Sequence, residues 1–120
     1  MVRVRIPERG DVFWIDPNPV QGREMKDRHC FIVITPKEIN TLGVCMTVPI
    51  TRGGVLTRNV GLAVVIVGHD TQGIAVCNQV RSFDIDTRVK QGSARYIETI
   101  DPVTTGEIIA RVISAIDSGA

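Results

Sequence analysis

The chain has 120 residues, of which 43% are hydrophobic, and its formal net charge is +1. This length suits a single domain over residues 1–120, and the hydrophobic fraction excludes a disordered chain. No apolar run reaches the roughly 18 residues of a membrane-spanning helix, and none of signal-peptide length follows Met1, so we expect a cytoplasmic protein that is not associated with membranes.

The basic residues are mostly arginine, which accounts for eleven of the fourteen. A guanidinium makes bidentate contacts with phosphate and stacks on bases better than an ammonium does. Several of these arginines fall in expected loops, among them Arg23, Arg28 and Arg52. A solvated surface explains each one singly, whereas their collection at loop tips favours contacts with phosphate.

The first half of the chain predicts three strands separated by polar segments. The β-branched and aromatic runs indicate strands at residues 11–16, 30–34 and 44–50. Pro17 ends the first strand because proline lacks a backbone donor, and residues 20–28 form a long charged loop. One helical turn is expected at residues 36–40.

The second half predicts more strands and then a helix. A loop is expected at residues 51–59, strands at 60–67 and 74–83, and a short strand or irregular return at 88–97. His69 and Asp70 fall in the turn between the two strands. With no further ligand nearby in sequence, they are interpreted as an ordinary polar turn.

A terminal helix is the clearest single element. Asp101 or Thr104 can cap it, and Pro102 suits its first turn. Its apolar residues recur at helical spacing and predict packing against the core or a second copy: Ile108, Ile109, Val112, Ile113 and Ile116.

These elements predict a mainly β fold with some helix. Five or six strands, two long loops and a terminal helix give a small antiparallel β-barrel with a C-terminal helix, and exclude a doubly wound α/β fold. Three widely spaced cysteines, Cys30, Cys45 and Cys77, form no Cys-x-x-Cys pair and predict buried thiols rather than a zinc site.

Three polar islands carry a family resemblance. They are Arg9-Gly10-Asp11-Val12-Phe13-Trp14, the turn Pro49-Ile50-Thr51-Arg52-Gly53-Gly54 and the segment Asn78-Gln79-Val80-Arg81. In this order and at these spacings, the chain resembles the MazF/PemK/Kid toxins from about Glu8 to its C-terminus. The resemblance implies an SH3-like barrel, a homodimer, metal-independent cleavage of single-stranded RNA or mRNA without a cofactor, and inhibition by an antitoxin with an acidic, disordered tail.

The resemblance also implies site residues in the first long loop. Gly22 and Glu24 match the family, whose loop ends in Arg-Pro, and an ungapped alignment places His29-Cys30 there. Either His29 replaces the arginine or Arg28 serves with the register shifted by one residue. Glu24 is then a second acid–base group or, as we prefer, an anchor for the arginine.

The other expected site residues follow the third strand. Thr51 matches the family's hydroxyl residue, and together with Glu24, Arg28 and His29 it makes up the expected catalytic set. The expected RNA-binding residues are Arg23, Arg52, Asn78, Gln79 and Arg81. Asn78-Gln79 matches the branch typified by ChpB, and an amide there acts by hydrogen bonding rather than as a base.

The chemistry requires no metal because RNA carries its own nucleophile. A base removes the 2′-hydroxyl proton, the oxygen attacks the adjacent phosphorus, and the 5′-oxygen leaves with a proton. A histidine has a suitable ordinary pKa for this work, and arginines can stabilise the charge on the phosphoryl group.

Two rival interpretations remain open. The fold expected here is shared with the CcdB gyrase poisons, but those end in Trp-Gly-Ile, whereas this chain ends in Asp117-Ser118-Gly119-Ala120. The missing Arg-Pro keeps a second alternative open, a noncatalytic barrel that only binds RNA or a peptide.

Overall fold

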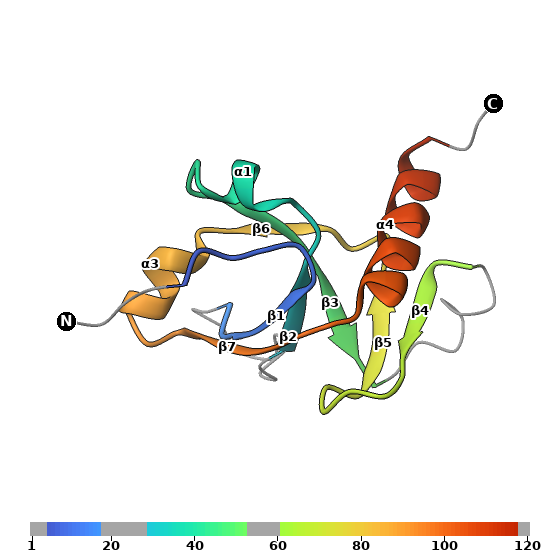
Figure 1. Cartoon of the computed structure of the whole chain (residues 1–120), viewed down its shortest axis with the longest axis horizontal. Helices are drawn as coiled ribbons and strands as arrows, with labels where there is room; N and C mark the ends of the chain where they lie inside the picture. Colours follow the sequence, from blue (N-terminus) through green and yellow to red (C-terminus); the bar gives the residue numbers. More distant parts are fainter. Residues whose placement is uncertain (1–4, 18–28, 53–60, 118–120) are drawn as a thin grey trace, which may run out of the picture.

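A single antiparallel sheet organises the chain (Figure 1). The computed structural model describes residues 5–17, 29–52 and 61–117. Its strands are β1 (Asp11–Ile15), β2 (His29–Val33), β3 (Cys45–Thr51), β4 (Ala63–Ile66), β5 (Gly73–Val76), β6 (Arg81–Phe83) and β7 (Ala94–Thr99). Six of them follow the order β4-β5-β3-β2-β1-β7, and β6 pairs with β3 beside that path. The predicted antiparallel fold with a C-terminal helix is therefore confirmed.

The strands bury side chains on both faces of the sheet. Val12, Ile32 and Val48 belong to one core, which helix α4 (Pro102–Ile116) covers through Ile108 and Val112. Side chains that alternate with these form a second core with α3 (Ile85–Lys90): Phe13, Ile15, Phe31, Val33, Cys45, Phe83, Ile85 and Ala94. Figure 1 shows α3 and α4 at opposite ends of the molecule. This alternation follows from the two-residue period of a strand, and it decides on which face each site residue lies.

The strand predicted at residues 74–83 is in fact two strands. On the edge of β3 that faces away from β2, β5 pairs with Ile50 and Thr51, and β6 pairs with Cys45, Met46 and Thr47. Between these two pairings lie Val48 and Pro49, and Pro49 has no N–H to donate to a neighbouring strand. The chain turns at Cys77 and Asn78 at this level, so the prediction of one continuous strand was wrong.

The prediction of a strand or irregular return at residues 88–97 was only half right. Helix α3 occupies Ile85–Lys90, and β7 begins at Ala94. Asp84 caps α3 by accepting hydrogen bonds from the backbone N–H and the hydroxyl of Thr87, at 3.1 and 2.8 Å. These contacts hold the pKa of Asp84 below its ordinary value. The helical turn expected at residues 36–40 is confirmed as α1 (Lys37–Asn40).

Helix α4 begins as predicted. Asp101 is its N-cap and accepts a hydrogen bond from the Thr104 N–H, while Pro102 occupies the first turn. The predicted apolar stripe is buried only in part, because Ile113 and Ile116 are 58% and 77% exposed. No helix in the described part of the chain is long and apolar enough to cross a membrane.

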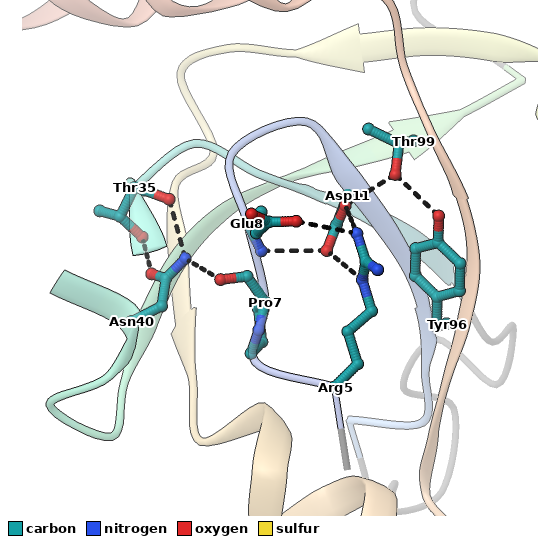
Figure 2. Close-up of polar contacts among 8 residues, drawn as sticks. All are labelled: Arg5, Pro7, Glu8, Asp11, Thr35, Asn40, Tyr96 and Thr99. Carbon is teal, nitrogen blue, oxygen red and sulfur yellow. Dashed lines mark hydrogen bonds and ion pairs between the residues drawn. The ribbon is translucent and has the colours of Figure 1, made fainter. Parts of the chain in front are cut away.

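The start of β1 is fixed by a buried carboxylate that the sequence did not reveal. Figure 2 shows Asp11, which is fully buried, accepting hydrogen bonds from Arg5 Nε, from the Glu8 N–H and from the Thr99 hydroxyl, at 2.9, 2.9 and 2.8 Å. Arg5 also stacks on Tyr96 at 4.5 Å from its ring centre. These contacts attach the N-terminal segment to β1 and β7.

The turn that precedes β1 needs a glycine, and Asn40 supports the segment from the other side. Gly10 has a φ of +95°, and a Cβ there would meet the Ile100 carbonyl at 3.2 Å. Asn40 donates hydrogen bonds to the carbonyls of Pro7 and Thr35 (Figure 2). This geometry confirms that Gly10 is the bend entering the first strand.

The turn between β4 and β5 holds an ion cluster instead of an ordinary polar turn. His69 contacts Asp101 through Nε2 at 2.8 Å and Glu98 through Nδ1 at 3.3 Å. The hydrogen bond with Asp101, followed by the contacts with Glu98, raises the pKa of His69. The pKa of Asp101 falls to about 2, chiefly because it accepts from the Thr104 backbone and from His69. His69 therefore attaches this turn to the end of β7 and the start of α4.

Candidate active site

His29 is the first residue of β2 and lies at the end of the second core. It pairs with Ile15, the last residue of β1. The alternation of β2 places its imidazole on the same face as Phe31, and the two rings meet edge to face with centres 6.2 Å apart. The ring is half-buried. His29 thus combines an imidazole held against the core with a position at the end of a strand.

Thr51 occupies the matching end of the neighbouring strand. The pairing of β2 with β3 runs from Val33 opposite Thr47 to Cys30 opposite Ile50. Continued by one residue, this register sets His29 opposite Thr51, with both side chains on one face of the sheet. Thr51 is the last residue of β3 and is half-buried. This extension of the register brings together an imidazole and a hydroxyl that are 22 positions apart in the sequence.

A cation lies further along the same face. Arg81 pairs with Thr47, whose hydroxyl donates a 2.7 Å hydrogen bond to the Arg81 carbonyl. The exposed guanidinium of Arg81 stands 4.9 Å from the ring centre of Phe83. Phe83 in turn contacts Phe31 edge to face at 4.9 Å, and Phe31 contacts His29. An aromatic row thus links the position of Arg81 to that of His29.

The remaining expected RNA contacts in the described chain are exposed. Arg52 directly follows β3. Asn78 and Gln79 lie in the turn between β5 and β6, where the Gln79 N–H donates to the Val76 carbonyl at 3.2 Å. The sequence predicted both residues on a strand, and this prediction was wrong because Pro49 has no N–H with which to pair a continuous neighbouring strand. From the turn, both amides extend toward solvent beside β3.

Three expected site residues, Arg23, Glu24 and Arg28, lie outside the described residues. The choice between Arg28 and His29 therefore stays a prediction, and so does the anchoring role of Glu24. Among residues 5–17, 29–52 and 61–117, no three His, Cys, Asp or Glu side chains are grouped so that they could hold a metal ion.

The thiols offer no nucleophile to this site. Cys45 and Cys77 are buried, and desolvation is the main cause that raises the pKa of each to about 11. Burial also raises the pKa of Cys30. Because only a thiolate attacks or binds metal effectively, these residues act as small apolar side chains at neutral pH.

The arrangement on this face can handle a phosphodiester. The end of β2 and β3 offers an imidazole for proton transfer and a hydroxyl for a phosphate oxygen. Arg81, which pairs with Thr47 four residues away along β3, offers a guanidinium for a more distant phosphate of the same strand. The sequence suggested each of these residues singly, but it did not show that β2, β3 and β6 present them on one face. It also did not single out Phe83, whose ring contacts both Phe31 and the guanidinium of Arg81.

Comparison with protein families gives a match over most of the chain. Residues 8–116 match the family described as PemK-like, MazF-like toxin of type II toxin–antitoxin system. The chain is 32% identical over 96 residues to the Endoribonuclease PemK of Escherichia coli, covering 78% of this chain and 72% of that protein. It is 32% identical over 92 residues to the Endoribonuclease toxin ChpB of Escherichia coli K12, covering 74% and 79%.

Solved structures resemble the chain in fold. MazF from Deinococcus radiodurans superposes with a TM-score of 0.75 at 20% identity, covering 94% of this chain and 98% of that one. A MazE–MazF structure from the same organism gives a TM-score of 0.77 at 20% identity, covering 94% and 97%. At this level of identity the superpositions support the antiparallel fold with its terminal helix.

Proposed function

Because the chain belongs to the PemK-like, MazF-like toxins of type II toxin–antitoxin systems, we propose that it is an endoribonuclease toxin that cuts single-stranded RNA at the end of β2 and β3. The observation that supports this proposal is the β2–β3 register, which, continued by one residue beyond Cys30 and Ile50, sets His29 opposite Thr51 on one face of the sheet. The relatives quoted above are named endoribonucleases. This favours RNA cleavage over both a gyrase poison and a noncatalytic barrel.

In the proposed reaction the 2′-hydroxyl of the RNA is the nucleophile. His29 exchanges a proton with the 2′-oxygen or with the departing 5′-oxygen, and Thr51 donates its hydroxyl to a phosphate oxygen. Arg52, which directly follows Thr51, stabilises charge on the phosphoryl group, and Arg81 attracts a more distant phosphate of the strand. If the register is shifted by one residue, Arg28 exchanges this proton instead, and His29 chiefly contacts the phosphates of the strand. Cleavage leaves a 2′,3′-cyclic phosphate and a 5′-hydroxyl.

Two partners belong to the same proposal. A homodimer would place two such faces in one assembly, and the exposed Ile113 and Ile116 of α4 give a second copy apolar surface to cover. An antitoxin with an acidic tail would compete with RNA, because arginines bind carboxylates as readily as phosphates. Light scattering should then report a dimer, and calorimetry should show that antitoxin and RNA exclude each other. Simultaneous binding of both would contradict a shared surface.

The experiment that tests the reaction is cleavage of single-stranded RNA in excess EDTA. We expect wild-type protein to cut the RNA and to leave cyclic phosphate ends, which mass spectrometry identifies. Double-stranded RNA of the same sequence is the matched control and should remain intact. Cleavage that EDTA abolishes and magnesium restores would refute the mechanism, and binding without cleavage would favour the noncatalytic alternative.

A further inference from the structure

A cavity of about 500 Å³ opens beside α3, on the same face of the sheet as His29 and Thr51. Its lining comes from the end of β1, from β6, from α3 and from the residue before β7: Asp16, Ser82, Phe83, Asp84, Thr87, Arg88, Gln91 and Ser93. No role assigned so far uses this cavity. The aromatic row leads to it, because Phe83 lines the cavity and contacts Phe31, which contacts His29.

The geometry points to a subsite for an unpaired nucleobase of the RNA, and for one that carries an exocyclic amino group. This inference rests on the proposed ribonuclease function and extends it to sequence selection. Residues in this cavity would not take part in the reaction itself. They would decide which base is accepted near the bond that is cut.

Arg88 supplies the platform on which a base would stack. Its guanidinium lies 5.0 Å from the ring centre of Phe83, and its Nη1 donates a 2.9 Å hydrogen bond to the Asp16 carbonyl. These two contacts hold the guanidinium at the cavity wall. Stacking on an arginine plane is a common way for proteins to hold a splayed RNA base. The aromatic row places this platform and His29 on the same side of the second core.

The charges of the lining select against simple ions. Two carboxylates, Asp16 and Asp84, disfavour a bare phosphate, and the guanidinium of Arg88 disfavours a bare cation. A neutral ring with both donors and acceptors on its edge satisfies the two kinds of group together. Asp84 already accepts two hydrogen bonds from Thr87, and each carboxylate oxygen has a second lone pair for an amino group.

This chemistry ranks the bases. Adenine, cytosine and guanine carry an exocyclic amino group that can donate to Asp84, whereas uracil has carbonyl oxygens in those positions. One position near the cut should therefore disfavour uracil. A bidentate contact to a base edge typically changes discrimination by about 5- to 150-fold. A single hydrogen bond to Asp84 belongs at the lower end of that range, so we expect about a tenfold preference.

The test is cleavage of a randomised single-stranded RNA pool by the full-length protein, with sequencing of the product ends. Arg88→Gln removes the stacking platform, so a base is no longer held where its edge can reach Asp84. This variant should keep cutting but lose the preference at one position by about tenfold. Lys90→Gln is the matched control, because it removes one positive charge from the same helix but Lys90 does not line the cavity. An unchanged base preference at every position in Arg88→Gln would overturn the proposal.

Asp84→Asn provides a second variant that keeps the cap of α3. The amide oxygen still accepts from the Thr87 N–H and the amide nitrogen can donate to the Thr87 hydroxyl, so the fold should survive. Because the amide nitrogen also donates to carbonyl oxygens, this variant should shift the selected position toward uracil. An unchanged preference in a folded Asp84→Asn would count against the subsite in the same way.

The assay separates failure of the subsite from failure of the proposed function. If wild-type protein cuts no RNA, the function is wrong, and the cavity is then tested by NMR titration of the wild type with cytidine and uridine monophosphates. Shifts at Ser82, Arg88 and Gln91 that are larger with the cytidine nucleotide would still support the subsite. Equal shifts with both nucleotides, or none, would refute it.

Discussion

Replacing Asp11 with asparagine should destabilise the fold strongly without affecting the chemistry of the site. The fully buried carboxylate accepts hydrogen bonds from Arg5, from the Glu8 N–H and from Thr99 (Figure 2). An asparagine side chain keeps one acceptor oxygen, and its amide nitrogen must face one of these donors. Breaking a buried ion pair costs about 3–5 kcal/mol.

The lower end of this range applies here, because the Arg5 side chain is 42% exposed and water can solvate its guanidinium when the carboxylate is lost. We therefore expect a loss of about 3 kcal/mol. For a domain of this length this corresponds to a fall in Tm of roughly 12 °C, at about 4 °C per kcal/mol. Asp11 begins β1, whereas His29 pairs with Ile15 at its end. Cleavage per folded molecule at low temperature should therefore be unchanged.

Circular dichroism during heating and in urea measures this loss. Lys90→Gln is the control, because it removes an exposed ion pair with Asp86, whose two side chains are 63% and 48% exposed. Such a pair contributes at most about 1 kcal/mol. If Asp11→Asn lowered Tm no more than Lys90→Gln does, the reasoning from burial would be refuted.

Two further predictions concern the site and the turn between β4 and β5. If His29 is the acid–base group, His29→Ala should reduce RNA cleavage by roughly 10²-fold or more, and Arg28→Ala should chiefly weaken RNA binding in a salt-sensitive way. Exchanged phenotypes would assign the basic role to Arg28. Full activity in both variants would exclude both residues. The pKa of His69 is raised in the folded protein, so its contacts with Asp101 and Glu98 stabilise the fold when the imidazole is protonated. This stabilisation is complete at pH values below the ordinary pKa of 6.5, and it is lost as the pH rises through the raised pKa. The difference in Tm between wild type and His69→Gln should therefore shrink with rising pH over this window, and a difference that stays constant would contradict the role of His69.

Local sequence patterns predicted those strands and helices whose apolar pattern and boundary residues all lie within one segment. The strands at residues 11–16, 30–34 and 44–50 were placed within a residue or two because their apolar runs are bounded by proline or polar residues. The helix α4 was found because its cap and its apolar period both lie within one segment. Helix α3 was missed, since only six residues form it and their β-branched content resembles a strand.

The features that the sequence did not predict depend on pairing between distant segments. The break between β5 and β6 reflects Pro49 on the neighbouring strand, which no pattern within residues 74–83 contains. Burial of Asp11 requires Arg5 and Thr99 to arrive from both sides. For the candidate site, the family resemblance supplied the expected residue types, but the strand register that, continued by one residue, sets His29 opposite Thr51 is a property of the folded sheet.

The most direct measurement of the central claim is RNA cleavage by Thr51→Val in excess EDTA. This change removes the hydroxyl at nearly constant volume, and Thr51 ends β3, so the fold should be retained. Loss of one hydrogen bond in the transition state typically costs about 0.5–1.5 kcal/mol when neutral and about 1.5–3 kcal/mol when a charged group is involved. With a phosphate oxygen as acceptor, the account predicts at least about a tenfold loss of kcat. Thr41→Val, which removes an exposed hydroxyl just after α1, should cut RNA as wild type does. Full activity in a folded Thr51→Val would contradict the assignment of the site to the end of β2 and β3.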